Sequence, residues 1–114
     1  MKICISGYGH MGKEVEIAAK AQNIEISKII DIDTDLESLN FDNDEIIIDF
    51  TCADAFLHNL PIFAKKSVSV ICGSTGWYDK EDEIKNIVEE NKIGFLYASN
   101  FSIGVHLFWK ILHN

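Results

Sequence analysis

The sequence ICISGYGHMG at residues 3–12 decides the fold, because a short apolar run leads directly into glycines spaced G-x-G-x-x-G. This spacing is typical of the turn between the first strand and first helix of a dinucleotide-binding domain. Gly7 permits the tight turn, Gly9 lets a pyrophosphate approach the backbone, and Gly12 lets the helix pack on the sheet. The N-terminus of such a helix can hold phosphates without a basic side chain. Glycine triplets also occur in plain turns, so the rest of the chain must decide.

Length, composition and charge narrow the class of protein. The chain has 114 residues, 47 % of them hydrophobic, and a formal net charge of −8. This length suits one domain that buries about two thirds of its unfolded surface. The acidic balance, without a basic stripe or tail, argues against a nucleic acid or an anionic membrane as partner. Because the chain opens on a strand and no apolar run approaches a membrane span, we expect a cytoplasmic protein.

Neither cysteine nor histidine spacing indicates a metal site. Cys4, Cys52 and Cys72 stand at wide, unrelated spacings that fit reduced thiols better than a disulfide framework or a zinc site. Cys4 and Cys72 lie in apolar runs, where cysteine behaves as a small hydrophobe. We expect three histidines on helix surfaces or in packing: His58, His106 and His113.

Short apolar runs alternate with amphipathic segments along the whole chain. Expected strands cover residues 3–6, 26–30, 46–48, 68–72 and 93–97, and expected helices cover residues 11–22, 53–64, 80–91 and 103–112. The acidic stretch 31–44 has room for only one helical turn, at 36–39, and Pro61 is expected to kink or end its helix early. This alternation predicts an α/β fold of Rossmann type, with a doubly wound parallel sheet in three α/β/α layers.

The first expected helix carries its apolar residues in one cluster. We expect its inward face to hold Val15, Ile17, Ala18, Ala19 and Ala21. In the helix over 80–91, the inward residues are expected to be Ile84, Ile87 and Val88.

Asp31 lies roughly 20 residues after Gly12, where a dinucleotide-binding domain places an acid on the adenosine ribose. A 2′-phosphate would meet this charge with a repulsion of about 1 kcal/mol in water and about 4 kcal/mol near a protein surface. The following residue, Ile32, offers no cation to offset it. The pattern therefore favours NADH over NADPH. The alternative is that Asp31 or Asp33 only ends a strand in an acidic loop.

The stretch Gly73-Ser74-Thr75-Gly76-Trp77 follows the fourth expected strand. Its backbone N–H groups and two hydroxyls can face a nicotinamide, but a plain turn explains the glycines equally well, with Asp79 as N-cap of the next helix. His10 fits equally well as a residue bordering phosphate or ribose and as a solvated loop residue. We expect the large aromatic residues to pack rather than stack on a base, with Phe101 as the exception: Trp77, Phe108 and Trp109.

Four motifs in this order resemble one family of reductases. They are Gly-Tyr-Gly-His-Met-Gly at 7–12, Ile-Asp-Phe-Thr at 48–51, Gly-Ser-Thr-Gly-Trp at 73–77, and Ala-Ser-Asn-Phe-Ser-Ile-Gly-Val at 98–105. The order is similar to that of the dihydrodipicolinate reductases, the 4-hydroxy-tetrahydrodipicolinate reductases of lysine and diaminopimelate biosynthesis. The resemblance spans the whole chain, and the last two motifs are the specific ones. It implies transfer of a hydride from NAD(P)H to a cyclic dicarboxylate.

The resemblance implies a set of cofactor-binding residues: Gly7, Tyr8, Gly9, His10, Met11, Gly12, Asp31, Phe50, Thr51, Gly73, Ser74, Thr75, Ala98, Ser99, Asn100 and Phe101. The stretch 7–12 would hold the pyrophosphate, and 50–51 would line the nicotinamide ribose. The stretch 73–75 would contact the nicotinamide, whose other side 98–101 would close. Thr75 would also face the substrate.

The chain departs from the family pattern in three ways. Family members that use NADPH often have Arg after the ribose acid, where this chain has Ile32, so NADH is the expected cofactor and NADPH the second choice. His10 replaces an Arg that the family often has in the glycine turn. The family's C-terminal domain, which grips the dicarboxylate, donates a proton and builds most of the homotetramer, is absent from these 114 residues.

We therefore interpret residues 1–114 as the dinucleotide-binding half of a reductase, present as a truncated product, a proteolytic product or the product of an interrupted gene. We predict no catalytic residue in the chain and weak binding of NADH without turnover. The family's homotetramer is built largely through the other domain, so the oligomeric state of residues 1–114 stays open at this point. Two alternatives remain at this point. One is a stand-alone NAD-binding sensor or partner-binding module, and the other is the N-terminal half of another amino-acid or hydroxy-acid dehydrogenase.

Overall fold

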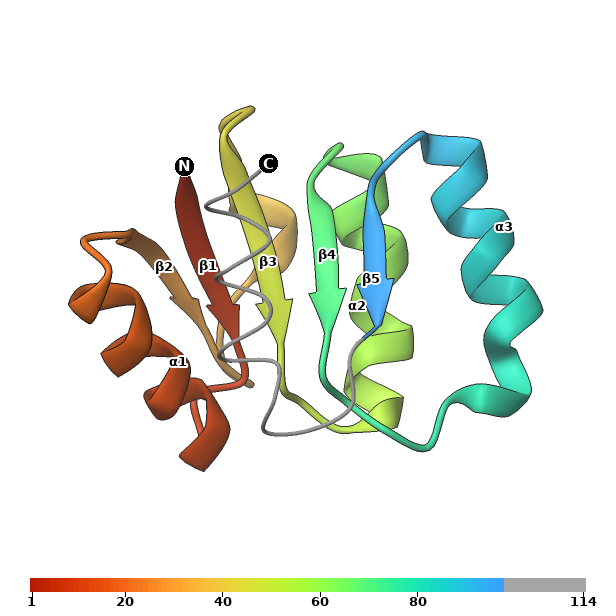
Figure 1. Ribbon diagram of the computed structural model, residues 1–114. Coiled ribbons are helices and arrows are strands. Elements are labelled where there is room, and N and C mark those ends of the chain that lie inside the picture. Colours follow the sequence, from red (N-terminus) through yellow and green to blue (C-terminus); the bar gives the residue numbers. More distant parts are fainter. Residues whose placement is uncertain (98–114) are drawn as a thin grey trace.

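The computed structural model describes residues 1–97 (Figure 1). Several predictions fall on residues 98–114 and lie outside the described residues. They are the helix at 103–112 and the roles of Ala98, Ser99, Asn100, Phe101, His106, Phe108, Trp109 and His113.

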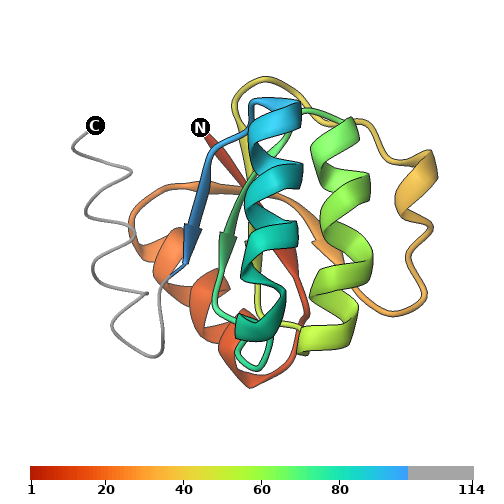
Figure 2. The same ribbon diagram turned by 90° about the vertical axis from the view of Figure 1, so that its right-hand side faces the viewer.

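Strands and helices alternate through the described part of the chain. In order they are β1 (Lys2–Ser6), α1 (His10–Ala21), β2 (Glu25–Ile30), η1 (Leu36–Ser38), β3 (Glu45–Asp49), α2 (Ala53–Lys65), β4 (Ser69–Cys72), η2 (Tyr78–Lys80), α3 (Glu81–Asn91) and β5 (Phe95–Tyr97). The five strands form one parallel sheet in the order β2-β1-β3-β4-β5. Helix α1 covers one face, and α2 and α3 cover the other (Figures 1 and 2). The predicted doubly wound, three-layer α/β/α fold is confirmed.

The core consists of two apolar clusters, one on each face of the sheet. Under α1, Val15 and Ala19 pack on β1 residues Ile3 and Ile5. The larger cluster lies under α2 and α3 and includes Phe56, Leu60, Phe63, Ile47, Val70 and Ile84. Strand β1 is buried on both faces, as a central strand of a doubly wound sheet should be.

Several local predictions were wrong. Ile17 is 63 % exposed and Ala21 is exposed as well, because at about 100° per residue both lie away from the face of α1 that carries Val15 and Ala19. Helix α2 does not end early at Pro61 but continues to Lys65. The proline removes one hydrogen bond at a cost of about 3 kcal/mol, whereas burial of the flanking Leu60 and Phe63 stabilises by roughly 1.5–3 kcal/mol each. Asp79 lies within η2 and does not cap α3, which follows Lys80 without a side-chain cap.

Each of the three α-helices within residues 1–97 is followed by a non-glycine residue with left-handed backbone. The φ angles are 58° at Asn23, 60° at Ser67 and 54° at Lys92. After α2, for example, the amide of Val68 donates to the carbonyl of Phe63 at 3.2 Å, which closes the helix end. Side chains other than glycine pay a steric penalty in this conformation.

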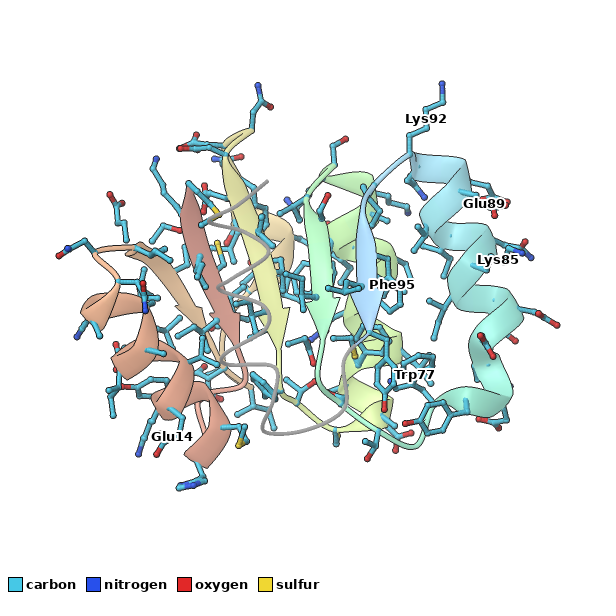
Figure 3. All side chains as sticks on the ribbon, viewed as in Figure 1. Glu14, Trp77, Lys85, Glu89, Lys92 and Phe95 are labelled. Carbon is cyan, nitrogen blue, oxygen red and sulfur yellow. The ribbon has the colours of Figure 1, made fainter. Side chains whose placement is uncertain are left out.

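We expect Ser67→Gly to raise the free energy of unfolding by about 0.5–1 kcal/mol. The left-handed backbone costs a non-glycine residue about 1–2 kcal/mol, and the greater freedom of glycine in the unfolded chain offsets about half of that gain. Urea denaturation of the purified chain measures the difference. As a control, Lys85→Gly on the exposed side of α3 (Figure 3) should lower stability by about 1 kcal/mol. A loss of stability in Ser67→Gly would contradict this account.

A buried carboxylate at the start of β3 joins three strands. Glu45, only 4 % exposed, accepts hydrogen bonds from Cys4 Sγ at 2.8 Å, Ser27 Oγ at 2.7 Å, Lys28 Nζ at 2.8 Å and the Asp42 amide at 2.7 Å. Burial by itself raises the pKa of Glu45, but these hydrogen bonds outweigh it and lower the pKa to about 2. Burial likewise raises the pKa of the Cys4 thiol to about 12. The carboxylate is therefore ionised in the folded chain.

The hydrogen bonds to Glu45 make the free energy of unfolding depend on pH. Because the folded pKa of Glu45 lies below its ordinary value of 4.5, the ionised carboxylate stabilises the fold above about pH 4.5. That contribution is lost as the pH falls towards 2. We expect Glu45→Gln to lower stability at pH 7 and to flatten the decline between pH 4.5 and 2, measured by urea denaturation at each pH. The exposed Glu89→Gln should keep the wild-type slope, and an equally steep decline in Glu45→Gln would refute the assignment.

Candidate functional site

The carboxyl ends of all five parallel strands meet at one edge of the sheet, the lower edge in Figure 1. Strand order reverses there, because β2 lies on one side of β1 and β3 lies on the other. In open α/β sheets, ligands bind in the crevice at such a reversal. The predicted site residues of 7–12, 31, 50–51 and 73–75 all belong to loops or helix starts at this edge.

Gly7 joins the turn after β1 to both neighbouring strands. Its φ is +95°, a conformation that L side chains rarely adopt. Its amide donates to the Ile30 carbonyl at 2.9 Å, and the Phe50 amide donates to the Ser6 carbonyl at 2.8 Å. A Cβ on Gly7 would lie 2.9 Å from the backbone of Phe50 and of Thr51. Only glycine fits here, for both reasons.

The other two glycines of the motif have different environments. A Cβ on Gly12 would lie 2.2 Å from the Gly7 carbonyl oxygen, so Gly12 lets α1 pack directly on the turn, as the sequence predicted. A Cβ on Gly9 would have no atom within 4 Å. No contact within the described protein requires glycine at that position, and the space above its backbone is open to a ligand.

The N-terminus of α1 faces this open space without a cap of its own. Gly9 is the N-cap residue, no side chain caps the helix, and its first turn contains no acidic residue. The first N–H groups and the positive end of the helix dipole are therefore available to an anion. His10 is exposed and Met11 is half-buried, whereas the hydroxyl of Tyr8 donates to Glu16 on α1.

A cleft of about 900 Å³ opens beside the glycine turn, between the segment after β2 and helix α2. Four predicted cofactor residues line it: Gly7, Tyr8, Asp31 and Thr51. Other lining residues were not predicted from the sequence: Ile32, Thr34, Asp35, Leu36 and Glu37 after β2, and Asp54, Ala55, His58, Asn59 and Ile62 on α2. The spacing of the α2 residues, three and four apart, is the signal that could have found them. His58 is exposed on α2, as expected.

Asp31 is exposed at the mouth of this cleft. Its Oδ1 accepts hydrogen bonds from the Asp33 amide at 3.0 Å and from Thr34 Oγ1 at 3.2 Å. The turn thus fixes the carboxylate through one oxygen. This geometry is compatible with both interpretations of Asp31. Its Oδ1 is used by the turn that ends the strand, and the carboxylate as a whole is exposed to a ribose.

The loops after β3 and β4 lie side by side on the other side of the switch point. Ser74 is buried, and its hydroxyl lies 3.0 Å from Asp49 Oδ1 and 2.9 Å from the Thr51 carbonyl. The side chain of Ser74 therefore points into the protein. Because its carbonyl also accepts a hydrogen bond from Trp77, the amide N–H is the backbone group left for a ligand. Thr75 is exposed. Trp77 is a buried packing residue, as predicted, with its indole N–H donating to the Ser74 carbonyl and its ring against Phe95 (Figure 3).

The thiols of the described residues are free and differ in exposure. Cys4 and Cys72 are buried, and burial raises the pKa of Cys72 to about 12. Cys52 is exposed at the N-cap of α2 and lines the cleft.

Within residues 1–97, no three His, Cys, Asp or Glu side chains are grouped to hold a metal ion. In the same range no helix combines the length and the apolar character needed to cross a membrane.

Curated relatives match nearly the whole chain. It is 33 % identical over 111 residues to the 4-hydroxy-tetrahydrodipicolinate reductase of Christiangramia forsetii, covering 97 % of this chain and 46 % of that protein. It is 31 % identical over 133 residues to the reductase of the same name from Archaeoglobus fulgidus, covering 98 % and 50 %. The chain thus spans about half the length of these relatives.

Solved structures share the fold at lower identity. An NAD-binding protein from Listeria innocua superimposes with a TM-score of 0.65 at 19 % identity, over 84 % of this chain and 34 % of the other. Apo scyllo-inositol dehydrogenase from Lactobacillus casei gives a TM-score of 0.56 at 12 % identity, over 86 % and 36 %. These two likenesses establish a Rossmann-like fold.

The family model described as the N-terminus of dihydrodipicolinate reductase matches residues 1–101. That range contains the glycine turn, the cleft and the paired loops after β3 and β4. The chain therefore belongs to the dihydrodipicolinate reductase family.

Proposed function

We propose that this chain is the dinucleotide-binding domain, residues 1–114, of an NADH-dependent 4-hydroxy-tetrahydrodipicolinate reductase of lysine and diaminopimelate biosynthesis. The observation that carries the proposal is the uncapped N-terminus of α1 behind the open space at Gly9, at the switch point of the sheet. Family membership supports this reaction over that of another dehydrogenase. The cytoplasm is the proposed location.

Each part of the cofactor has a proposed position. The pyrophosphate lies on the N–H groups at the start of α1, and Asp31 accepts hydrogen bonds from the adenosine ribose. Thr51 lines the nicotinamide ribose, and the backbone of 73–75 contacts the nicotinamide, which supplies the hydride. The exposed Thr75 hydroxyl faces the substrate.

The chain spans about half the length of the curated relatives it matches. We propose that in the whole enzyme the dicarboxylate grip, the proton donor and most of the homotetramer interface lie outside the residues matched here. We accordingly propose that residues 1–114 bind NADH but do not turn over the substrate.

The cleft near Asp31 is acidic, which supports a preference for NADH. Asp35 and Glu37 also line it. Ile32, which directly follows Asp31 and is 98 % exposed, offers no positive charge to a 2′-phosphate. A 2′-phosphate would add negative charge beside these carboxylates. Since Asp31 is exposed, its repulsion of a 2′-phosphate should be close to the value in water, about 1 kcal/mol. This corresponds to roughly fivefold in affinity.

We expect NADH to bind more tightly than NADPH in a fluorescence titration, and Asp31→Asn to narrow the difference by about fivefold. The amide oxygen of Asn can still accept the hydrogen bonds from Asp33 and Thr34, so the turn should survive. Glu14→Gln, an exposed change on α1 away from the cleft, is the charge-matched control and should alter neither affinity (Figure 3). Equal affinities for the two cofactors in the wild type would contradict the preference.

The glycines at 9 and 12 give a second test. Gly9→Ala should leave the Tm unchanged, because its Cβ meets no protein atom, but should weaken NADH binding by about tenfold or more, because it occupies the phosphate position. Gly12→Ala should instead destabilise the fold by about 1–3 kcal/mol, because its Cβ overlaps the Gly7 carbonyl.

The exposed thiol of Cys52 reports binding independently of cofactor fluorescence. NADH should slow its alkylation in the wild type and not in Gly9→Ala. Unchanged NADH affinity in Gly9→Ala would remove the glycine turn from the phosphate site.

A further inference from the structure

One fully buried carboxylate at the site edge has no role in the cofactor contacts described above. Asp49 is the last residue of β3 and is 0 % exposed. It immediately precedes the 50–51 loop. We propose that Asp49 is a positioning residue that fixes the loops after β3 and β4 relative to each other and thereby shapes the nicotinamide half of the site. This inference rests on the proposed function.

A single oxygen of Asp49 connects the two loops. Its Oδ1 accepts hydrogen bonds from the Thr51 amide at 3.0 Å and from Thr51 Oγ1 at 2.7 Å, both in the loop after β3. The same oxygen lies 3.0 Å from Ser74 Oγ, in the loop after β4. Three hydrogen bonds to one oxygen thus tie the loop after β3 to the loop after β4.

The backbones of the two loops meet around the same residue. The Gly73 amide donates to the Asp49 carbonyl at 2.8 Å. A Cβ on Gly73 would lie 2.2 Å from Phe50 Cε1, so the ring of Phe50 lies directly against the Gly73 backbone. The carbonyl of Ser74 also accepts a hydrogen bond from the indole N–H of Trp77. Moving either loop therefore breaks contacts of the other.

Ion pairing does not account for a carboxylate at this position. Burial of an ionised group is costly unless it is paired. No Lys, Arg or His within residues 1–97 forms an ion pair with Asp49, and its Oδ2 has no hydrogen-bond partner there. Ser6 Oγ, on the residue of β1 in register with Asp49, is equally buried and equally without a partner. Violations of polar pairing are expected at functional sites rather than in a structural core.

The position of Asp49 makes its effect separable from that of the adenosine half. All its side-chain partners lie in the loops after β3 and β4. Asp31 follows β2, which is separated from β3 by β1. Loss of the Asp49 carboxylate should therefore affect a ligand that reaches the nicotinamide loops and spare one that ends at the phosphates.

The experiment is direct calorimetric titration of the 114-residue chain with NADH and with ADP. Asp49→Ala should weaken NADH binding by about tenfold or more and change ADP binding by less than about twofold. Asp49→Asn keeps a carbonyl oxygen that can accept the three hydrogen bonds, so it should restore most of the NADH affinity. Asp31→Asn is the matched control and should weaken both ligands alike.

The outcomes separate this inference from the proposed function. Absence of NADH binding in the wild type overturns both. Wild-type binding with an unchanged affinity in Asp49→Ala overturns the positioning role alone, and so does an equal loss of NADH and ADP, which would indicate general damage to the fold. If Asp49→Ala does not fold, Ser74→Ala decides, because it removes one partner and keeps the carboxylate. It should weaken NADH about threefold and spare ADP, and equal effects on the two ligands would overturn the proposal.

Discussion

Backbone contact between the Gly7 turn and its neighbours constrains the rest of the structure. The turn must leave β1, approach the Phe50–Thr51 backbone and accept the start of α1 within a few residues. Any side chain at Gly7 or Gly12 would push one of these segments away. The same packing places the N-terminus of α1 above the reversal of strand order, so the anion-binding end of a helix and the crevice of the sheet coincide. Fold and site therefore depend on one set of contacts.

An acidic protein can attract an anionic cofactor because the attraction comes from the backbone. The net charge of the chain is −8, and the first turn of α1 contains no acidic residue. The two ends of β3 show a related contrast. Glu45 at its start is held by Lys28 and three other donors, whereas Asp49 at its end binds neutral donors through one oxygen. The first arrangement stabilises the strand packing, and the second is typical of a site that sacrifices stability for geometry.

The sequence predicted those features that depend on local patterns. Apolar runs identified the five strands, and the glycine spacing identified the turn and the start of α1. Features that depend on contacts between distant segments were missed. The inward turn of the Ser74 hydroxyl requires Asp49 from another strand, and the cleft wall at His58 and Ile62 requires α2 to lie beside the segment after β2. Pro61 was misread because tertiary packing of α2 outweighs a local helix-breaking preference.

The left-handed residues that follow the three described helices all lie at one edge of the sheet. Asn23, Ser67 and Lys92 all lie just before strands begin, at the same edge as Glu45 and opposite to the cofactor loops. The helix ends and the Glu45 network are thus separated, across the length of the strands, from the loops that are proposed to contact a ligand. Substitutions at the helix ends can therefore change the stability of the domain without directly altering the cofactor loops.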